Sequence, residues 1–197
     1  MQTDFLWPFV TIMVSAAFTP GPNNIMITAS GANFGYLRSL PHMMGVTLGF
    51  PLMLLIMAFG LGELFTRWPQ IHDVLRYLGA VYLFYLAWRV ATAGRTEVKA
   101  RSRPLNFLEA SAFQWINPKG VLFAISVIAA FAAPGPDFYQ RISVMGTIAL
   151  MTAFASITTW CLFGMAISRL LRTDRALRIF NITMAVLLAG SVILLFV

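Results

Sequence analysis

The sequence predicts an all-α membrane protein with six transmembrane helices. Hydrophobic residues make up 59% of the 197 residues, charged residues make up 11%, and the mean hydropathy is +0.78. A soluble domain contains roughly 45–50% apolar and about 25% charged residues. Such a domain would expose too much of this apolar excess, and intrinsic disorder requires low hydrophobicity. We therefore expect a single transmembrane domain over residues 1–197.

Long apolar stretches separate the few charged residues. A membrane helix needs about 20 mostly apolar residues. The expected spans are approximately Phe5–Ile27, Met43–Phe65, Val74–Ala93, Phe107–Ala133, Arg141–Arg169 and Ile179–Val197. The first stretch has no basic residue in front of it and is interrupted by Pro and Asn residues. We therefore expect it to be a retained helix and not a cleaved signal peptide.

The basic residues predict the orientation of these spans. Ten cations follow spans one, three and five: Arg38, Arg89, Arg95, Lys99, Arg101, Arg103, Arg169, Arg172, Arg175 and Arg178. Only Arg67, Arg76 and Arg141 lie on the opposite side. Cytoplasmic loops are enriched in Lys and Arg, so both termini are expected outside the cytoplasm. Residues 94–104 would form a cytoplasmic linker, and residues 134–137 an outer turn.

The two halves, residues 1–93 and 105–197, resemble each other weakly. Leu75–Ala80 is similar to Leu177–Ile182 at an offset of 102, and Met44-Gly45 matches Met145-Gly146 at an offset of 101. With three spans in each half, the second half must insert in the opposite orientation to the first. The sequence therefore predicts two inverted three-helix repeats.

Helix-breaking residues interrupt span one and span four. They are Thr19, Pro20, Gly21, Pro22, Asn23 and Asn24 in the first and Asn117, Pro118 and Lys119 in the second. Non-helical backbone inside a bilayer persists only against protein or a wet cavity. Matched breaks in inverted repeats indicate a transporter's central site. The freed amides and carbonyls would suit a zwitterion, whereas the alternative interpretation is a pair of structural kinks.

Lys119 is the one charged residue expected deep inside a span. It lies 12 residues past Phe107, which places it roughly 18 Å along the helix and near the middle of the bilayer core. Charges at this depth are costly and are functional hypotheses by default. Lys119 would bind a substrate carboxylate or exchange a proton. The alternative is a structural cation bonded to carbonyls around the Pro118 break.

Other function classes lack the residues that they need. The single cysteine, Cys161, excludes a disulfide framework and a cysteine-based zinc site. His42 and His72 are expected at span edges, and no span contains a nucleophile-base or metal-ligand set. We expect no catalytic residue, metal or cofactor. Because the basic residues occur in short loops, a nucleic-acid partner is not expected either.

The motifs together resemble the lysine-exporter (LysE/RhtB) family of bacterial amino-acid exporters. Thr19-Pro20-Gly21-Pro22-Asn23 carries the family signature, and the Gly45–Gly49 spacing, Leu78–Leu83 and Asn117-Pro118-Lys119 support it. The resemblance covers essentially the whole chain. It implies a multi-pass protein of the bacterial inner membrane that exports amino acids, driven by the proton motive force and without ATP. The resemblance does not determine the oligomeric state, for which a homodimer is one candidate.

The resemblance leaves the substrate open. The Asn23-Asn24 pair and Leu86–Arg89 resemble both cysteine/O-acetylserine and threonine/homoserine exporters. Spans one, two and five lack a buried carboxylate for a cationic substrate, so we favour small neutral amino acids. The alternatives are export of a basic amino acid or another small metabolite, and a passive channel. Lys119, Glu63 and Glu109 are the candidates for proton coupling.

Overall fold

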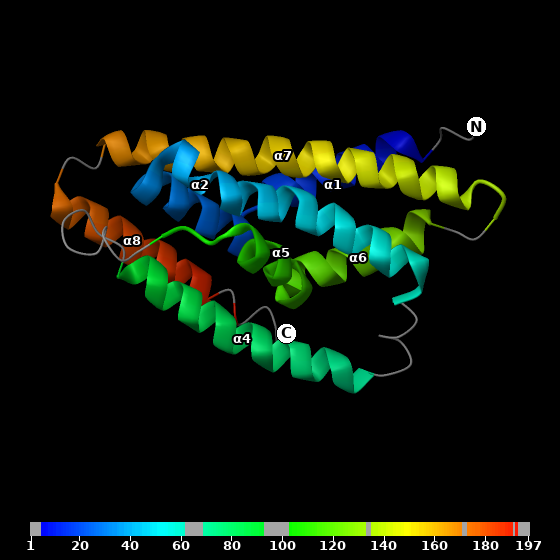
Figure 1. Ribbon diagram of the computed structural model, residues 1–197, viewed down its shortest axis with the longest axis horizontal. Helices are drawn as coiled ribbons and strands as arrows, with labels where there is room; N and C mark the ends of the chain where they lie inside the picture. Colours follow the sequence, from blue (N-terminus) through cyan, green and yellow to red (C-terminus); the bar gives the residue numbers. More distant parts are fainter. Residues whose placement is uncertain are drawn as a thin grey trace.

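The computed structural model describes residues 5–61, 69–92, 103–132, 135–170, 173–190 and 192. Regular structure in these segments is helical throughout, as the sequence predicts. The helices are α1 (Leu6–Phe18), α2 (Pro22–Ile56), the π-helical segment η1 (Met57–Leu61), α4 (Pro69–Ala91), α5 (Phe107–Ile116), α6 (Pro118–Phe131), α7 (Phe138–Leu170) and α8 (Asp174–Gly190). They lie side by side in an elongated bundle (Figure 1).

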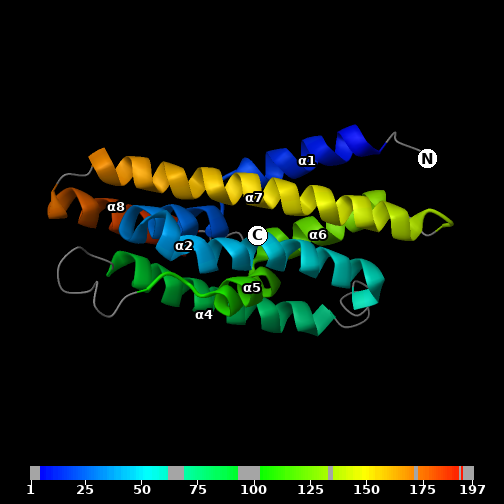
Figure 2. The same ribbon diagram turned by 45° about the horizontal axis from the view of Figure 1, so that its top comes forward.

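The helix α2 is a hairpin of two arms that meet at Gly35. Gly35 has a φ of 78° and a ψ of 178°, a conformation that residues with a Cβ rarely adopt. In a straight helix, Ser30 and His42 would lie about 18 Å apart. Their Oγ and Nδ1 atoms are 3.0 Å apart, so residues 36–56 run back alongside residues 22–34. Both views show this reversal (Figures 1 and 2).

Length and composition mark out the candidate membrane spans among the described residues. Phe138–Leu170 and Pro22–Gly60 are both long and apolar enough to cross a membrane, the second counted through the reversal at Gly35. Phe107–Ile116 and Lys119–Phe131 add a third if this pair, bent by 64°, is one broken span. Large apolar side chains cover much of the outer surface, including Leu108, Val81 and Met151. These features are consistent with a membrane protein.

Antiparallel helix pairs organise the bundle. The two arms of α2 pack along α7, and α4 packs against α8. The second arm of α2 and α7 run in opposite directions, as do α4 and α8 (Figures 1 and 2). The junctions α1–α2 and α5–α6 both lie near the middle of the long axis (Figure 2). Two interrupted helices therefore meet inside one bundle.

Glycines permit the closest helix contact, between the first arm of α2 and α7. A Cβ at Gly31 would collide with the carbonyl of Cys161, and a Cβ at Gly164 would collide with the carbonyl of Thr28. The contact is reciprocal, because each glycine lies three residues from the residue whose carbonyl meets the other. Small residues allow membrane helices to approach in this way. The spacing holds α7 against the helix that begins at the first break.

The observed boundaries refine the predicted ones. Helical structure continues between the first two predicted spans, because the reversal at Gly35 takes a single residue. The expected sixth span starts earlier, at Asp174, and the described part of its helix ends at Gly190. Most of the 94–104 linker and Glu63 lie outside the described residues. The six-span inverted repeat remains a prediction.

Replacing Gly164 with alanine tests the close contact. Alanine favours helix by about 1 kcal/mol over glycine. At Gly164 the collision with Thr28 outweighs this gain, and overpacking typically costs about 1–3 kcal/mol. We expect Gly164→Ala to lower the melting temperature in detergent by several degrees. Gly190→Ala is the control, because a Cβ there meets nothing within 4 Å. Equal stability of the two variants would contradict the packing.

Candidate functional site

The first break separates the end of α1 from the start of α2. The chain is extended at Thr19 and Gly21, and Pro22 is the first residue of α2. The first backbone bond of α2 runs from the Ile25 N–H to the Gly21 carbonyl, at 2.9 Å. The amides of Asn23 and Asn24 precede that bond, and no side chain caps the helix start. The positive end of the α2 dipole is therefore uncapped.

The second break, between α5 and α6, also places an extended residue before a helix that begins with proline, but it is shorter. Asn117 alone is extended, and it both ends α5 and precedes α6. Pro118 again occupies the first helical position, where its missing N–H costs nothing. The Val121 N–H bonds to the Asn117 carbonyl at 3.0 Å, and no side chain caps α6. A second uncapped helix start results, with the amides of Lys119 and Gly120 ahead of the first bond.

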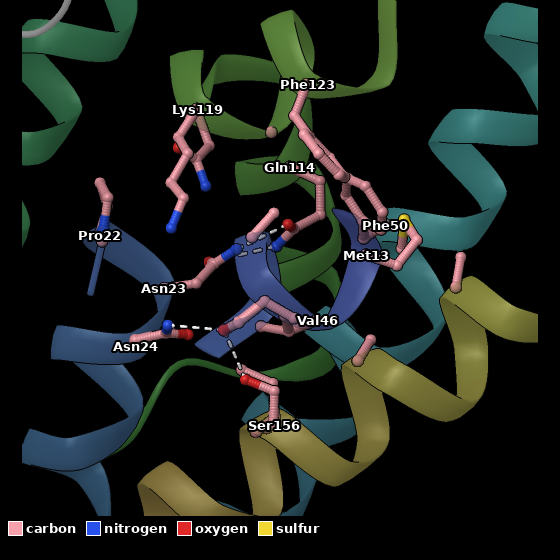
Figure 3. Close-up of a pocket in the computed structure, with 18 residues that line it drawn as sticks. Met13, Pro22, Asn23, Asn24, Val46, Phe50, Gln114, Lys119, Phe123 and Ser156 are labelled. Atoms are coloured by element: carbon pink, nitrogen blue, oxygen red, sulfur yellow. Dashed lines mark hydrogen bonds between the residues drawn. The ribbon is translucent and has the colours of Figure 1, made fainter. Parts of the chain in front are cut away.

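One cavity lies between the two breaks (Figure 3). About 90 Å³ of it is open to the centres of water molecules, which is room for several waters or one small organic molecule. Both uncapped helix starts contribute to its wall, through Pro22, Asn23, Asn24, Asn117, Lys119 and Gly120. Met13, Phe50 and Phe123 supply apolar wall, with the two phenyl rings stacked at 6.3 Å. The cavity is therefore polar at the breaks and apolar elsewhere.

Side-chain amides connect the breaks. The Asn23 Nδ2 donates to Gln114 Oε1 at 2.8 Å, and the Gln114 Nε2 donates to Asn23 Oδ1 at 3.4 Å (Figure 3). The Gln114 Nε2 also donates to the Ala110 carbonyl within α5. Gln114 is fully buried. This pair fixes the start of α2 to α5 and holds one wall of the cavity.

The carbonyls released at the end of α1 bond to side chains from three elements. Asn24 Nδ2 donates to the carbonyls of both Ala17 and Thr19, each at 2.9 Å. Ser156 of α7 donates to the Ala17 carbonyl at 2.6 Å. Lys119 Nζ donates to the Thr19 carbonyl at 2.6 Å. The carbonyl end of the break is thus satisfied, whereas the amide end has no side-chain cap and its residues line the cavity.

Lys119 reaches from α6 across the cavity to the other break. Besides Thr19, its ammonium lies 3.5 Å from the Pro20 carbonyl. Gly21 allows this crossing, since a Cβ there would lie 2.9 Å from the Lys119 Cδ. Lys119 therefore does bond to carbonyls, but they belong to the first break and not to the Pro118 break of the structural alternative. Its ammonium has donors to spare and also lines the cavity.

The cavity combines groups that favour an anion with a buried polar acceptor. Lys119 and two uncapped helix starts favour a carboxylate. The Asn117 Oδ1 is buried without a hydrogen-bond partner in the described part of the chain, and Asn117 is 3% exposed. An unpaired buried acceptor is costly, and an ammonium is a good donor to it. No acidic side chain is among the described residues of the lining.

The structure gathers most of the predicted site residues. Gly21, Pro22, Asn23, Asn24, Asn117 and Lys119 line the cavity. Thr19 and Pro20 contribute their carbonyls to Lys119, and their side chains are exposed. Pro118 begins α6, but its side chain lies outside the description. The sequence therefore identified both breaks and most of the side chains between them.

The candidates for proton coupling do not lie together in the described structure. Lys119 lies in the cavity, and Glu63 is outside the described residues. Glu109 lies at the start of α5, where both its oxygens accept from Arg103 at 2.7 Å. It also completes a capping box with Asn106. This exposed ion pair at the helix start gives Glu109 a structural role, away from the cavity.

Sequence reasoning missed Gln114 and Ser156 and misplaced His42. Gln114 precedes Asn117 by three residues, one helical turn, which is a spacing that could have been noticed. Ser156 has no such mark, since a serine in an apolar helix commonly bonds within its own helix. His42, expected at an interface, is 1% exposed. It is buried because the hairpin folds it against the first arm of α2.

A double-mutant cycle tests the amide bridge. Asn23→Ala and Gln114→Ala remove the same pair of bonds, so their effects on the free energy of unfolding should be non-additive by about 0.5–3 kcal/mol. Asn23→Ala with Asn33→Ala is the control cycle. Asn33 lies about 15 Å further along the arm and bonds to Asn181 instead. Additive losses in the first cycle would mean that the bridge is absent.

Comparisons with known proteins identify the family of this chain. The model of the family described as LysE type translocator matches residues 14–197. The chain is 31% identical to the cysteine/O-acetylserine efflux protein of Salmonella paratyphi A over 197 residues, and 29% identical to that of Escherichia coli K12 over 196, with 100% of each chain covered. No solved structure matches it significantly. The chain therefore belongs to the LysE type translocator family.

Proposed function

We propose that this protein is a secondary transporter that exports small neutral amino acids or their derivatives from the cytoplasm. The substrate class is that of cysteine, O-acetylserine, threonine and homoserine. The single observation that carries the proposal is the cavity lined by two uncapped helix starts, by Lys119 and by Asn117, whose buried Oδ1 has no hydrogen-bond partner among the described residues. Broken helices that expose such groups are the usual form of a transporter's binding site.

The chemistry of the cavity supports a zwitterion over a cation. The substrate carboxylate would take the free donors of Lys119 and the amides at the starts of α2 and α6. The substrate ammonium would donate to the Asn117 Oδ1. A basic side chain would find no carboxylate among the described residues of the lining. Phe50, Phe123 and Met13 would hold a short apolar, thiol or ester side chain.

The names of similar proteins support the same substrate class. Full-length relatives from Salmonella and Escherichia are cysteine/O-acetylserine efflux proteins. Family membership favours a translocator over an enzyme. The proposed driving force is the proton motive force, and the proposed location is the bacterial inner membrane. Lipid contacts would fall on the apolar outer faces of the helices.

We further propose that α1 with the first arm of α2, and α5 with α6, are the equivalent broken helices of two inverted three-helix repeats. The second arm of α2 would correspond to α7, and α4 to α8. Their antiparallel pairing and the matched breaks support this assignment. The cavity would then lie near the membrane midplane.

Flux through reconstituted vesicles tests the function. We expect the purified protein to carry radiolabelled cysteine, O-acetylserine, threonine or homoserine, with saturation and a response to an imposed pH gradient. A passive channel of the same architecture would give unsaturable flux that ignores the gradient. L-lysine is the cationic comparison, and it should be carried poorly. If none of the four neutral compounds shows gradient-dependent flux, the proposal is wrong.

Variants at the second break test the site. Lys119→Ala removes a charged donor, and Asn117→Ala removes the unpaired acceptor. Each change should reduce flux by about ten- to a hundredfold, because a hydrogen bond to a charged group contributes roughly 1.5–3 kcal/mol. Lys99→Ala is the matched control at the other lysine of the chain. Full activity in both folded variants would remove these residues from the site.

Single cysteines test the orientation. In a Cys161→Ser background, Gly135→Cys should react with a membrane-impermeant maleimide added to whole cells. Thr173→Cys lies between the basic residues that predict a cytoplasmic loop, and it should react only after the membrane is permeabilised. The reverse pattern would place both termini on the cytoplasmic side.

A further inference from the structure

A second cavity lies further along the first arm of α2. About 50 Å³ of it is open to the centres of water molecules. Its lining includes Ser30 and Asn33 of the first arm, His42 of the second arm, Arg89 of α4 and Arg103 of the segment before α5. Ser30 follows Asn24 by six residues, roughly 9 Å along the helix. The two cavities therefore lie within about two turns of one helix, the second one nearer Gly35.

His42 is placed as a titratable group inside this part of the bundle. Its Nδ1 is 3.0 Å from the Ser30 Oγ. Its Nε2 is buried and has no hydrogen-bond partner among the described residues. If Nδ1 carries the proton and donates to Ser30, Nε2 is a free acceptor. A buried acceptor without a donor is unfavourable, which points to a ligand or proton that satisfies it.

The charges around His42 come from three elements. Arg89 of α4 lines the same cavity, and within the described part of the chain one of its five donors bonds to the Arg103 carbonyl at 2.6 Å. Glu109 of α5 is an acidic residue near this part of the bundle, and Arg103 pairs with both of its oxygens at 2.7 Å. Neither α7 nor α8 contributes a charged residue to the described lining. Among the described residues, Arg89 is therefore the charge with donors available to an anion.

We propose that this second cavity is a substrate site at which a proton and the amino acid compete for His42. The inference rests on the function proposed above. The substrate carboxylate bonds to Arg89, and its ammonium donates a hydrogen bond to the Nε2 of neutral His42. A proton that binds Nε2 turns this acceptor into a donor and makes the ring a cation. The ammonium then loses its partner and is repelled, so the substrate leaves while the proton is carried.

This exclusion is the requirement for antiport. A carrier whose site holds either the substrate or a proton exchanges one for the other. The predicted orientation places Gly35 and this cavity on the cytoplasmic side of the central cavity, where the substrate enters. With one proton per amino acid, a gradient of one pH unit would sustain about a tenfold gradient of substrate. His42 is thereby a further proton carrier, beside the coupling candidates Lys119, Glu63 and Glu109 that the sequence offers.

His42→Gln separates this inference from the function itself. Glutamine keeps a buried acceptor for the ammonium but does not titrate. In vesicles with radiolabelled L-cysteine kept reduced, the variant should lose accumulation driven by a pH gradient, and the KM of its remaining exchange should no longer depend on pH. The wild type should show accumulation and a pH-dependent KM, and His72→Gln is the matched control. No flux in the wild type would refute the proposed function, whereas gradient-driven accumulation in folded His42→Gln would refute the role of His42 alone.

A second measurement uses the wild type, so it does not depend on the folding of a variant. Competition predicts that the KM for cysteine exchange rises as the pH falls from about 8 to about 4, with the maximal rate unchanged. A KM that does not change over this range would overturn the proposal. Loss of exchange in a His42→Gln protein that melts like the wild type would also overturn it.

Arg89→Gln tests the carboxylate partner. Loss of the guanidinium should raise the KM for cysteine by about ten- to a hundredfold while the response to the pH gradient persists at saturating substrate. Arg169→Gln, at an exposed position of α7, is the control and should leave KM unchanged. An unchanged KM in Arg89→Gln would show that the carboxylate does not bind there.

Discussion

Backbone groups released where a helix stops inside an apolar bundle need partners from elsewhere in the chain, and this constraint shapes the molecule. At the end of α1 the carbonyls of Ala17 and Thr19 are released, and Asn24, Ser156 and Lys119 satisfy them. Each of these partners comes from a different helix, so closing the first break also joins α2, α6 and α7 around it. The amide ends of both breaks have no side-chain cap. The residues there line the cavity, where a ligand can satisfy their N–H groups.

Close helix packing holds the polar groups at the two breaks within hydrogen-bonding distance of one another. Gly31 and Gly164 bring the backbones of α2 and α7 into contact, which places Ser156 within reach of the Ala17 carbonyl. Gly45 and Gly49 allow a similar approach of the second arm of α2 to α5, where Ser111 donates to the Gly45 carbonyl at 3.1 Å. The α5 helix carries Gln114, so this contact also positions the amide bridge to Asn23. Small residues in the bundle thus determine the geometry of the polar cavity.

The sequence alone predicted the features that depend on local chemistry. Scarce charges and long apolar runs predicted a helical membrane protein, and Pro22 and Asn117-Pro118 predicted the two breaks. The sequence alone could not predict the features that depend on tertiary contacts. The carbonyls bonded by Lys119 lie about a hundred residues away in the chain, and the hairpin at Gly35 is what buries His42. The sequence around Ser156 or Arg89 does not distinguish these residues from a serine or an arginine that faces lipid or a loop. Only the packing of α7 and α4 reveals their positions.

The central claim is that the two breaks form one binding site for a small zwitterion. An experimental structure determined with bound L-cysteine or O-acetylserine tests it most directly. The account predicts ligand density between the starts of α2 and α6, with the carboxylate near Lys119 and the ammonium near the Asn117 Oδ1. Ligand density elsewhere in the bundle, with this cavity filled only by water, would contradict it.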